Sequence, residues 1–432
     1  MSQPLQLVPF RRNSQALLPA FDKAVALLLP LCLVIDWING LTRFYSGADY
    51  AISASYKAVL LAFVFAAVAL QRPRWVFSGS AVLLLMLLGP SFMWPAQSWR
   101  WVFADTMLAV KALAPLLLLA YLYLLTRRNM RLASKILQHT LWLSTAVLLL
   151  NALLGLAGLG GSAYQPLDGV AQAFLGIKGF FSSTNELSAV LLVLSAALLA
   201  ISWPISVLYY SLISLGALAL ALLLLTKTGI FGCSILIILV PLLHQPKTFW
   251  LRHRAVWLTG LAMVVLLIIL LIFNGKALLQ LLGIFDKLQF VYQQRGVTGI
   301  LLSSRDYYAG RIWQLVQTEY PWWQQLLGVG QGEVALQLKK YFAELDWFDL
   351  FIFHGLTGFA VWLVTFTVFF RICWQRRQLA LARQLMLLNC LLLLVSAMAG
   401  HVLTSGMLWP VWALVHLMLL KPAKGSVHER PV

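Results

Sequence analysis

The stretch Leu187–Ile201 reads LSAVLLVLSAALLAI and contains no charged side chain. Uncharged apolar runs of the same kind occur at Ala24–Val34, Val59–Leu70 and Gly260–Phe273. Of the 432 residues, 61% are hydrophobic and only 11% are charged, whereas a soluble domain has about 25% charged residues. Water cannot be the solvent for most of such a chain. The sequence therefore predicts a membrane protein.

The apolar runs have the length of membrane-spanning helices. A helix needs about 20 apolar residues to cross the hydrocarbon layer, and this criterion predicts an all-α polytopic fold with about twelve spans. The junctions near 203–204 and 400–402 are tight enough for either to be a re-entrant bend. The expected spans cover 20–40, 50–70, 75–94, 102–125, 136–158, 186–203, 205–225, 228–244, 255–274, 348–370, 384–400 and 402–420.

The position of the basic residues predicts the orientation. The net charge is +18, and in a membrane protein Lys and Arg mark the cytoplasmic loops. Clusters such as Arg11–Arg12, Arg127–Arg131 and Arg371–Arg383 all fall before the first span or after an even-numbered one, whereas most acidic residues fall on the other side. Both termini are therefore expected in the cytoplasm, and the positive charge indicates topology rather than nucleic-acid binding.

The cysteines point to neither a disulfide framework nor a metal site. They lie in or beside apolar segments, and no two of them form a C-x-x-C pair, which is the usual signature of zinc or redox chemistry. We interpret them as packing residues. They are Cys32, Cys233, Cys373 and Cys390.

Two outward-facing segments are long enough to hold structure. Residues 159–185 are rich in Gly and Ser, and a second loop of about 70 residues precedes the tenth span. Loops of that length are usually functional. The chain is thus divided into spans 1–9 with their outer loop (1–274), a large outer loop with amphipathic helices (275–347), and spans 10–12 with a cytoplasmic tail (348–432).

Four basic residues on the outer side are candidate anion ligands. Lys227 stands in a Thr-Lys-Thr-Gly turn after the seventh span, Arg305 and Arg311 lie in the large loop, and Lys178 precedes the sixth span. Guanidinium and ammonium groups bind phosphate oxygens. The alternatives are a lysine that extends to the membrane interface and an Arg305 that simply pairs with Asp306.

Three carboxylates lie where the large loop enters the tenth span. Glu344, Asp346 and Asp349 fall within six residues, and a carboxylate whose pKa is raised by burial can deprotonate a sugar hydroxyl. Asp346 and Asp349 are three residues apart and would share a helix face, on which they could also hold a divalent cation. A polar cap at the start of the helix explains one acid easily and three poorly.

Four further polar residues are candidates for supporting roles. His354 and His401 are the histidines assigned to the outer half, and either could orient a carboxylate or act as a base. Asn185 and Glu186 stand at the entry to the sixth span. The alternatives are interhelical hydrogen bonds for the histidines and a helix cap for Asn185.

Taken in order, these motifs resemble a known family. The segment Lys178–Glu186 (KGFFSSTNE) resembles the G-F-F-x-x-x-N-E entry of the bacterial O-antigen ligase and polymerase superfamily, and Leu225–Gly229 (LTKTG) resembles its basic turn. Arg305 and Arg311, followed by Leu327–Gly330, are similar to its outer-loop arginines and GxG, and the segment from Asp349 to Gly358 is similar to its GxxG span. The resemblance covers residues from about 160 to 420.

The resemblance implies a GT-C-type glycosyltransferase in the bacterial inner membrane, with its site on the periplasmic face. Such enzymes transfer glycan from undecaprenyl diphosphate with inversion, generally without a metal and without a cofactor. Carried over, Lys227 and Arg305 or Arg311 would bind the diphosphate. Two departures stand out: Lys227 replaces a frequent arginine, and Glu344 stands eleven residues before Gly355, where ligases have histidine.

Glu344 in place of histidine favours a polymerase, in which undecaprenyl-diphosphate-linked oligosaccharides are both donor and acceptor. It also makes Glu344 the first choice for the base. A chain-length regulator and membrane lipids are further expected partners. The alternatives are a ligase that transfers polymer to lipid A-core and, from another class, a secondary transporter. The short link between the sixth and seventh spans argues against a transporter built from two six-span halves.

Overall fold

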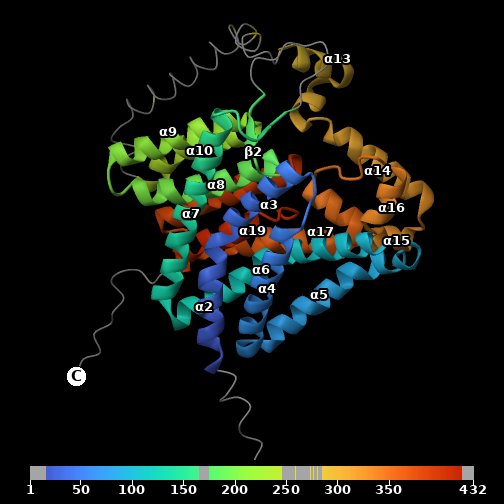
Figure 1. The fold of residues 1–432 in the computed structure, drawn as a ribbon, viewed down its shortest axis with the longest axis horizontal. Coiled ribbons are helices and arrows are strands. Elements are labelled where there is room, and N and C mark those ends of the chain that lie inside the picture. Colours follow the sequence, from blue (N-terminus) through green and yellow to red (C-terminus); the bar gives the residue numbers. More distant parts are fainter. Residues whose placement is uncertain are drawn as a thin grey trace, which may run out of the picture.

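The computed structural model describes residues 16–164, 175–245 and 285–420, together with the isolated positions 258, 273, 276 and 280. The described chain is almost entirely helical (Figure 1). Its elements are α2 (Leu18–Leu28), η1 (Leu29–Leu31), α3 (Cys32–Ser46), α4 (Ile52–Gln71), α5 (Pro73–Ser91), η2 (Trp94–Ala96), α6 (Trp99–Arg128), α7 (Met130–Leu156), β1 (Gly161–Ser162), β2 (Ile177–Gly179), α8 (Thr184–Ser202), α9 (Val207–Leu224), α10 (Lys227–His244), α13 (Phe285–Leu302), α14 (Arg305–Glu319), α15 (Trp322–Leu327), α16 (Gly330–Gln337), α17 (Asp346–Gln375), α18 (Ala380–Met398), α19 (Leu408–Val415) and α20 (Leu417–Leu420).

Within the described residues, ten helices are long and apolar enough to cross a membrane, and each corresponds to one of the predicted spans. The first of them, Leu18–Ser46, combines α2, η1 and α3. The ninth predicted span, 255–274, lies outside the described residues. The last one, predicted at 402–420, starts only at Leu408. Residues 399–407 instead form an irregular loop, because Asp346 binds the backbone of residues 401–403. We call this segment the 399–407 loop.

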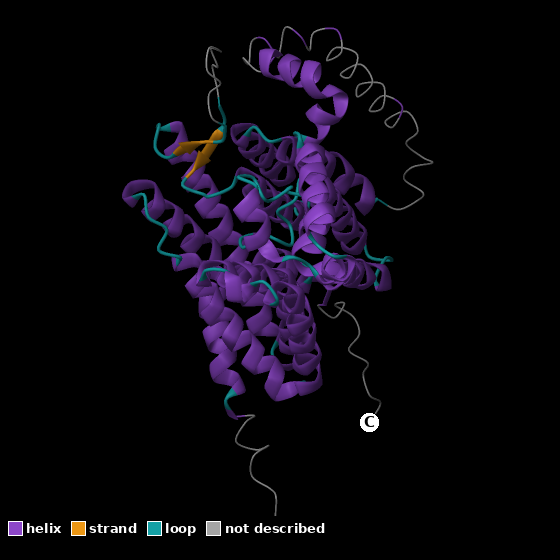
Figure 2. Ribbon diagram, turned by 90° about the vertical axis from the view of Figure 1, so that its right-hand side faces the viewer, coloured by secondary structure: helices purple, strands orange, loops and turns teal. Residues whose placement is uncertain are grey.

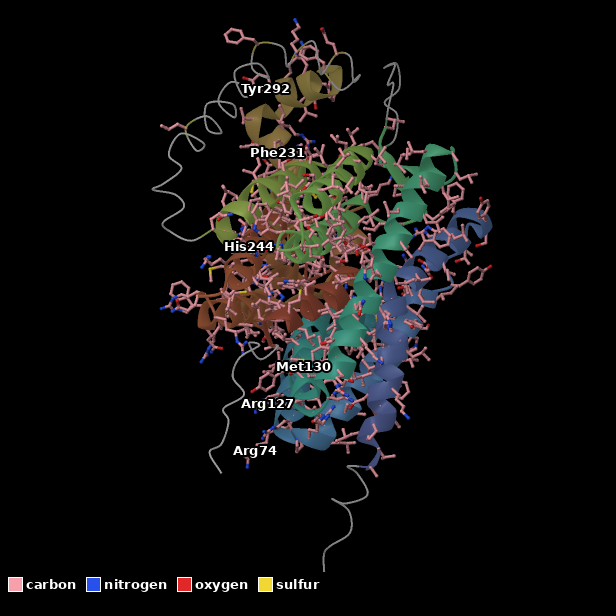
Figure 3. All side chains as sticks on the ribbon, turned by 90° about the vertical axis from the view of Figure 1, so that its left-hand side faces the viewer. Arg74, Arg127, Met130, Phe231, His244 and Tyr292 are labelled. Atoms are coloured by element: carbon pink, nitrogen blue, oxygen red, sulfur yellow. The ribbon has the colours of Figure 1, made fainter. Side chains whose placement is uncertain are left out.

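The two ends of the bundle differ. Arg74 and Arg127 lie close to each other at one end, as expected for two loops on the same side of a membrane, and Tyr292 of α13 lies at the opposite end (Figure 3). We call the latter the loop end. The two-stranded sheet β1–β2 also lies there (Figure 2). Asn151 of α7 binds the backbone of this sheet through the carbonyl oxygen of Lys178 at 3.1 Å and the amide of Phe180 at 2.9 Å.

Helix α8 is the most deeply buried of the candidate spans in the described chain. Nearly every side chain from Leu187 to Ala200 is inaccessible to solvent, since α8 packs against α9, α10, α18 and α19. A helix that is apolar all round belongs in such a position. The run that identifies the chain as a membrane protein is therefore also the centre of its helix packing.

The two glycine motifs of the outer loop and α17 fit against each other. Gly355 breaks α17 with a φ of 63°, and a Cβ built on it would lie 2.1 Å from the carbonyl oxygen of Leu326. A Cβ on Gly328 would lie 2.5 Å from the carbonyl oxygen of Phe353, and Val329 donates a backbone hydrogen bond to Ile352 at 2.9 Å. Only glycine permits this approach, so the motifs bring the outer loop into backbone contact with α17.

Asp105 of α6 binds the backbone of the residue that follows the Gly328–Gly330 motif. Asp105 is fully buried and accepts hydrogen bonds from the backbone N–H of Gln331 at 2.7 Å and from the indole of Trp94 at 3.2 Å. A buried carboxylate is stable only when it is paired or hydrogen-bonded. Asp105 therefore ties α16 to α6.

Candidate active site

Glu344 is the centre of a charged cluster at the loop end. Its Oε2 accepts a hydrogen bond from Arg305 Nη2 at 2.8 Å, its Oε1 lies 3.3 Å from Lys340 Nζ, and His401 Nε2 lies 3.9 Å from Oε2. The side chain of Arg305 is 9% exposed and that of Glu344 is 26% exposed, so the pair is largely shielded but open on one side. The cluster joins the start of α14, the segment before α17 and the 399–407 loop.

The cations keep Glu344 ionised. Burial alone would raise the pKa of Glu344, but the positive charges of Arg305 and Lys340 outweigh this effect and hold its pKa below the ordinary value. Opposite charges within about 4–6 Å favour the ionised carboxylate in this way. The sequence-based expectation of a carboxylate with a raised pKa therefore does not hold for Glu344.

Arg305 is presented by an unusual turn. Ser303 and Ser304 both have positive φ, 53° and 67°, and Arg305 is the first residue of α14. Its Nη1 donates a hydrogen bond to the carbonyl oxygen of Leu302 at 3.3 Å, and its buried Nε has no partner among the described residues. Two consecutive left-handed residues are strained, and here they turn the guanidinium toward Glu344.

Lys227 reaches the same turn from the start of α10. Its Nζ donates hydrogen bonds to the carbonyl oxygen of Ile300 and, at 3.4 Å, to Ser303 Oγ. The hydroxyl of Tyr164 donates a hydrogen bond to the carbonyl oxygen of Leu225 at 3.1 Å. Burial raises the pKa of this tyrosine, and the nearby positive charge of Arg305 offsets part of that rise. The basic turn at Lys227 and the arginine of the outer loop are therefore neighbours, as the site prediction requires.

Asp346 is fully engaged with the protein. From within the described chain it accepts five hydrogen bonds of 2.7–3.0 Å, from the backbone N–H groups of the 399–407 loop and from two hydroxyls. It is completely buried. The donors are the backbone amides of His401, Val402 and Leu403 and the side chains of Ser396 and Thr404.

Asp349 binds the segment that carries Glu344. It is 2% exposed and accepts hydrogen bonds from the backbone of Ala343 at 2.9 Å and of Leu345 at 3.1 Å. Glu344 itself has a φ of 62°, a backbone conformation that residues other than glycine rarely adopt. Asp346 and Asp349 therefore position the loops around Glu344 and His401. The described residues contain no group of three or more potential ligands among His, Cys, Asp and Glu.

Among the described residues, four members of the predicted site form no hydrogen bond or ion pair with the Glu344 cluster. Arg311 is exposed on α14 and lies 6.0 Å from the ring centroid of Tyr307. His354 is fully buried and its Nδ1 donates to the carbonyl oxygen of Met86 at 3.0 Å, so it joins α17 to α5. Lys178 and Asn185 are half-buried in β2 and in the first turn of α8. The cap of α8 is Ser183, which accepts from the backbone of Glu186, and not Asn185.

Glu186 belongs to a second polar cluster that the sequence did not reveal. Its Oε2 accepts a hydrogen bond from Ser405 in the 399–407 loop at 2.6 Å. Nearby, Asp36 of α3 pairs with Lys57 of α4, and both are buried. Ionisable residues in apolar helices are the signal that could have found this pair. The 399–407 loop therefore contacts the Glu344 cluster through His401 and the second cluster through Ser405.

Residues 285–420 match the family model described as O-antigen ligase like membrane protein. This segment contains most of the outer loop, the glycine motifs and α17–α20, and over these residues the match confirms the resemblance to the O-antigen ligase superfamily. The motifs Lys178–Glu186 and Leu225–Gly229 lie outside the match. No curated protein and no solved structure matches the chain.

Proposed function

Since residues 285–420 carry the O-antigen ligase-like domain, which supports a membrane enzyme of O-antigen or polysaccharide assembly, we propose that the protein is a polymerase. It joins undecaprenyl-diphosphate-linked oligosaccharide repeats at the periplasmic face of the inner membrane. The observation that supports this most is the cluster of Arg305, Lys340, Glu344 and His401, with Lys227 beside it.

The charge of this cluster fits a diphosphate leaving group. Arg305, Lys340 and Lys227 carry three positive charges and Glu344 carries one negative charge. The acceptor hydroxyl attacks the anomeric carbon, the bond between that carbon and the diphosphate oxygen breaks, and the electron pair leaves with the diphosphate. Cations held in place before the reaction stabilise this developing charge without reorganising.

Glu344 receives the proton of the attacking hydroxyl. The positive charges of Arg305 and Lys340 lower its pKa, and a carboxylate with a low pKa is a weak base. A diphosphate bound to Arg305 and Lys340 shares their positive charge, so the pKa of Glu344 rises when the donor is present. His401, 3.9 Å away, is placed to orient the carboxylate. Donor binding thus prepares the base for the acceptor.

The test compares two arginines of the same helix. Arg305→Met and Glu344→Gln are expected to abolish long polymer in cells at unchanged protein level, since removing one group that stabilises a transition-state charge typically lowers the rate by about 10²–10³-fold. Arg311→Met is the matched control and should retain long chains, because Arg311 lies exposed on α14. Normal chain lengths in Arg305→Met would overturn the proposal.

The glycans of a deletion strain separate the polymerase from the ligase. Single repeats on the lipid carrier are expected if the protein polymerises them. Long chains that remain unattached to lipid A-core would instead identify a ligase.

A further inference from the structure

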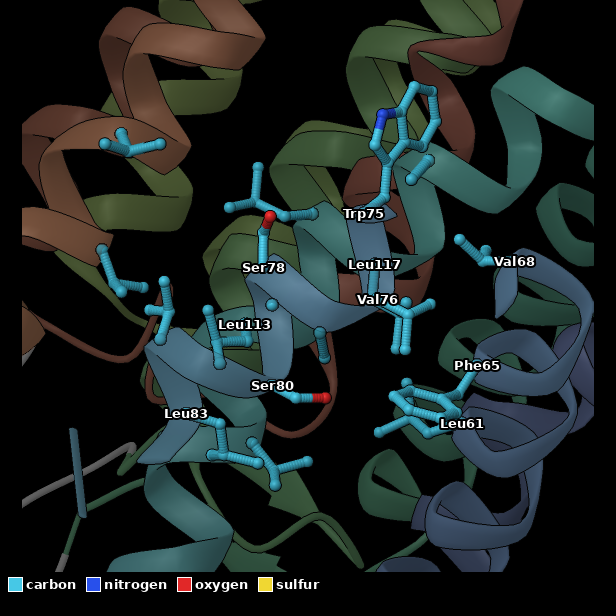
Figure 4. Close-up of a pocket in the computed structure, with 18 of the residues that line it drawn as sticks. Leu61, Phe65, Val68, Trp75, Val76, Ser78, Ser80, Leu83, Leu113 and Leu117 are labelled. Carbon is cyan, nitrogen blue, oxygen red and sulfur yellow. The ribbon is translucent and has the colours of Figure 1, made fainter. Parts of the chain in front are cut away.

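A long apolar groove lies between α4, α5, α6 and α17 (Figure 4). Its volume is about 600 Å³, and none of the described residues that line it is charged. Phe65 of α4 and Val76 of α5 face each other across it (Figure 4). The lining residues of α6 recur every three or four positions and therefore share one face of that helix. They are Val110, Leu113, Ala114, Leu116, Leu117 and Ala120.

The groove has the length of one leaflet of a bilayer. It extends from Ala58 to Val68 on α4 and from Val110 to Ala120 on α6, which is about 15 Å on each helix at a rise of 1.5 Å per residue. The hydrocarbon layer is about 30 Å thick. On α5 the lining starts at Trp75, in the first turn of the helix. The groove therefore opens toward the end of the bundle with Arg74 and Arg127, whose basic loops are expected in the cytoplasm (Figure 3).

Three arginines stand at this end of the groove. The guanidinium carbon of Arg72 lies 5.9 Å from the ring centroid of Trp75. That of Arg127 lies 4.6 Å from the ring centroid of Tyr123, and the two rings are 6.4 Å apart. Arg74 is the residue before Trp75 and is exposed. None of the three arginines forms an ion pair within the part of the chain that the structure describes, so their charges remain available to an anion.

We propose that the groove binds one anionic glycerophospholipid of the cytoplasmic leaflet. Its acyl chains lie in the groove and its phosphate binds the three arginines. Basic pockets between membrane helices on the cytoplasmic side bind acidic lipid head groups in this way.

The charge of the site selects against a zwitterionic phospholipid, because the ammonium group of such a lipid needs a carboxylate. No acid occurs among the lining residues or in the segments 69–82 and 106–131. Asp22 of α2 lies at the same end of the bundle, but Arg128 and Tyr121 already bind it. The site is also separate from the Glu344 cluster, which lies at the loop end, so the inference does not depend on the proposed function.

The lipid would cover the helix that the protein itself covers least. Only 17% of the apolar window of α5 is buried, the lowest share among the candidate spans of the described chain. The second half of α5 nevertheless contacts the glycine turn, since a Cβ on Gly89 would lie 2.2 Å from the carbonyl oxygen of Leu327. A ligand that binds only the folded protein stabilises it. The lipid should therefore raise the unfolding temperature.

The experiment titrates the delipidated full-length protein with phosphatidylglycerol or with phosphatidylethanolamine of the same acyl chains. Native mass spectrometry counts the bound lipids, and a thermal scan gives the unfolding temperature. We expect one phosphatidylglycerol to bind with about tenfold or higher affinity than phosphatidylethanolamine, because three cations attract its head group. Phosphatidylglycerol should also raise the unfolding temperature more.

The head-group site is tested by charge. Arg74→Gln combined with Arg127→Gln should remove the preference for phosphatidylglycerol. The matched control is Arg131→Gln combined with Lys135→Gln. It removes the same charge from α7, which contributes no described residue to the groove, and should keep the preference.

The acyl-chain site is tested by filling the groove. Gly79 lines it, and a Cβ there would meet no heavy atom within 4 Å. Gly79→Phe should therefore abolish the selective binding. The matched control is Gly216→Phe on α9, where a Cβ also meets no heavy atom within 4 Å, and it should bind like the wild type.

Equal affinity for the two phospholipids overturns the proposal, as does a preference that survives in Gly79→Phe or in the double arginine variant. Equal competition by undecaprenyl phosphate would assign the groove to an isoprenoid lipid. A dimer that Gly79→Phe dissociates would assign it to a second copy of the chain. Either of these results also overturns the proposal. Binding is measured without turnover, so its outcome is independent of the effect of Arg305→Met on polymer.

Discussion

Replacing Asp346 by asparagine tests whether this acid positions a loop or performs chemistry. Its Oδ1 accepts from the backbone of His401 and its Oδ2 from the backbone of Val402 and Leu403. An amide has one accepting oxygen, so in Asp346→Asn at least one backbone N–H faces another donor. Hydrogen bonds to a charged group contribute about 1.5–3 kcal/mol, and a buried donor without an acceptor costs about 1–3 kcal/mol.

We therefore expect Asp346→Asn to lower the free energy of unfolding by about 3–5 kcal/mol and to release the 399–407 loop. The assay is unfolding of the purified protein by SDS in mixed micelles, together with modification of a cysteine placed at Gly406, where a Cβ has only ordinary van der Waals contacts. Asp306→Asn, an exposed acid in the first turn of α14, is the control and should change stability by less than about 1 kcal/mol. Lost activity with unchanged stability would refute the positioning role and assign Asp346 to catalysis.

Three further predictions concern the glycine contact, the base and the basic turn. Gly355→Ala should destabilise the protein by about 3 kcal/mol or more, because the φ of Gly355 is 63° and the new Cβ would meet a carbonyl oxygen. The control is Gly310→Ala in α14, where a Cβ would meet no heavy atom within 4 Å. It should stabilise the protein by about 0.5–1 kcal/mol. In Lys340→Met the pKa of Glu344 should rise, because the variant lacks a positive charge that lowers this pKa. The acid limb of the profile of kcat/KM against pH should therefore move to higher pH. An unchanged acid limb would argue against Glu344 as the base. Lys227→Met should lower the affinity of the purified protein for undecaprenyl diphosphate, whereas Lys227→Arg should retain it. Equal affinity in the wild type and both variants would exclude Lys227 as a phosphate ligand.

Much of the fold follows from hydropathy, because a membrane restricts the choice of structure. Apolar runs of about 20 residues have to be helices in lipid, and the predicted spans correspond to the helices found in the described chain. The last span was the exception. Its sequence, from Val402 onward, is apolar enough to cross a membrane, but the start of the helix is set by a distant residue, Asp346, which binds the backbone of residues 401–403. Local hydropathy cannot reveal a contact between residues more than 50 positions apart in the sequence.

The candidate site was predicted in part. Residue chemistry and order pointed to Arg305, Glu344 and Lys227, which the structure brings close together. Arg305 and Arg311 could not be separated by sequence, because only the packing of α14 shows which one is buried. Lys340 was missed, since a lysine four residues from a glutamate in a polar loop is unremarkable until both meet Arg305.

The backbone contact between Gly328 and Gly355 closes a ring of chain that contains Glu344. Backbone contacts hold both ends of this ring. The segment between α16 and Lys340 can therefore change in length without altering these contacts. Closing a flexible loop costs only about 0.6 kcal/mol more for each doubling of its length. Extra residues between α16 and Lys340 would therefore enlarge the rim for a bulkier or branched sugar without loosening the anchor. Under the proposed function, this gives one scaffold a simple route to different glycan substrates.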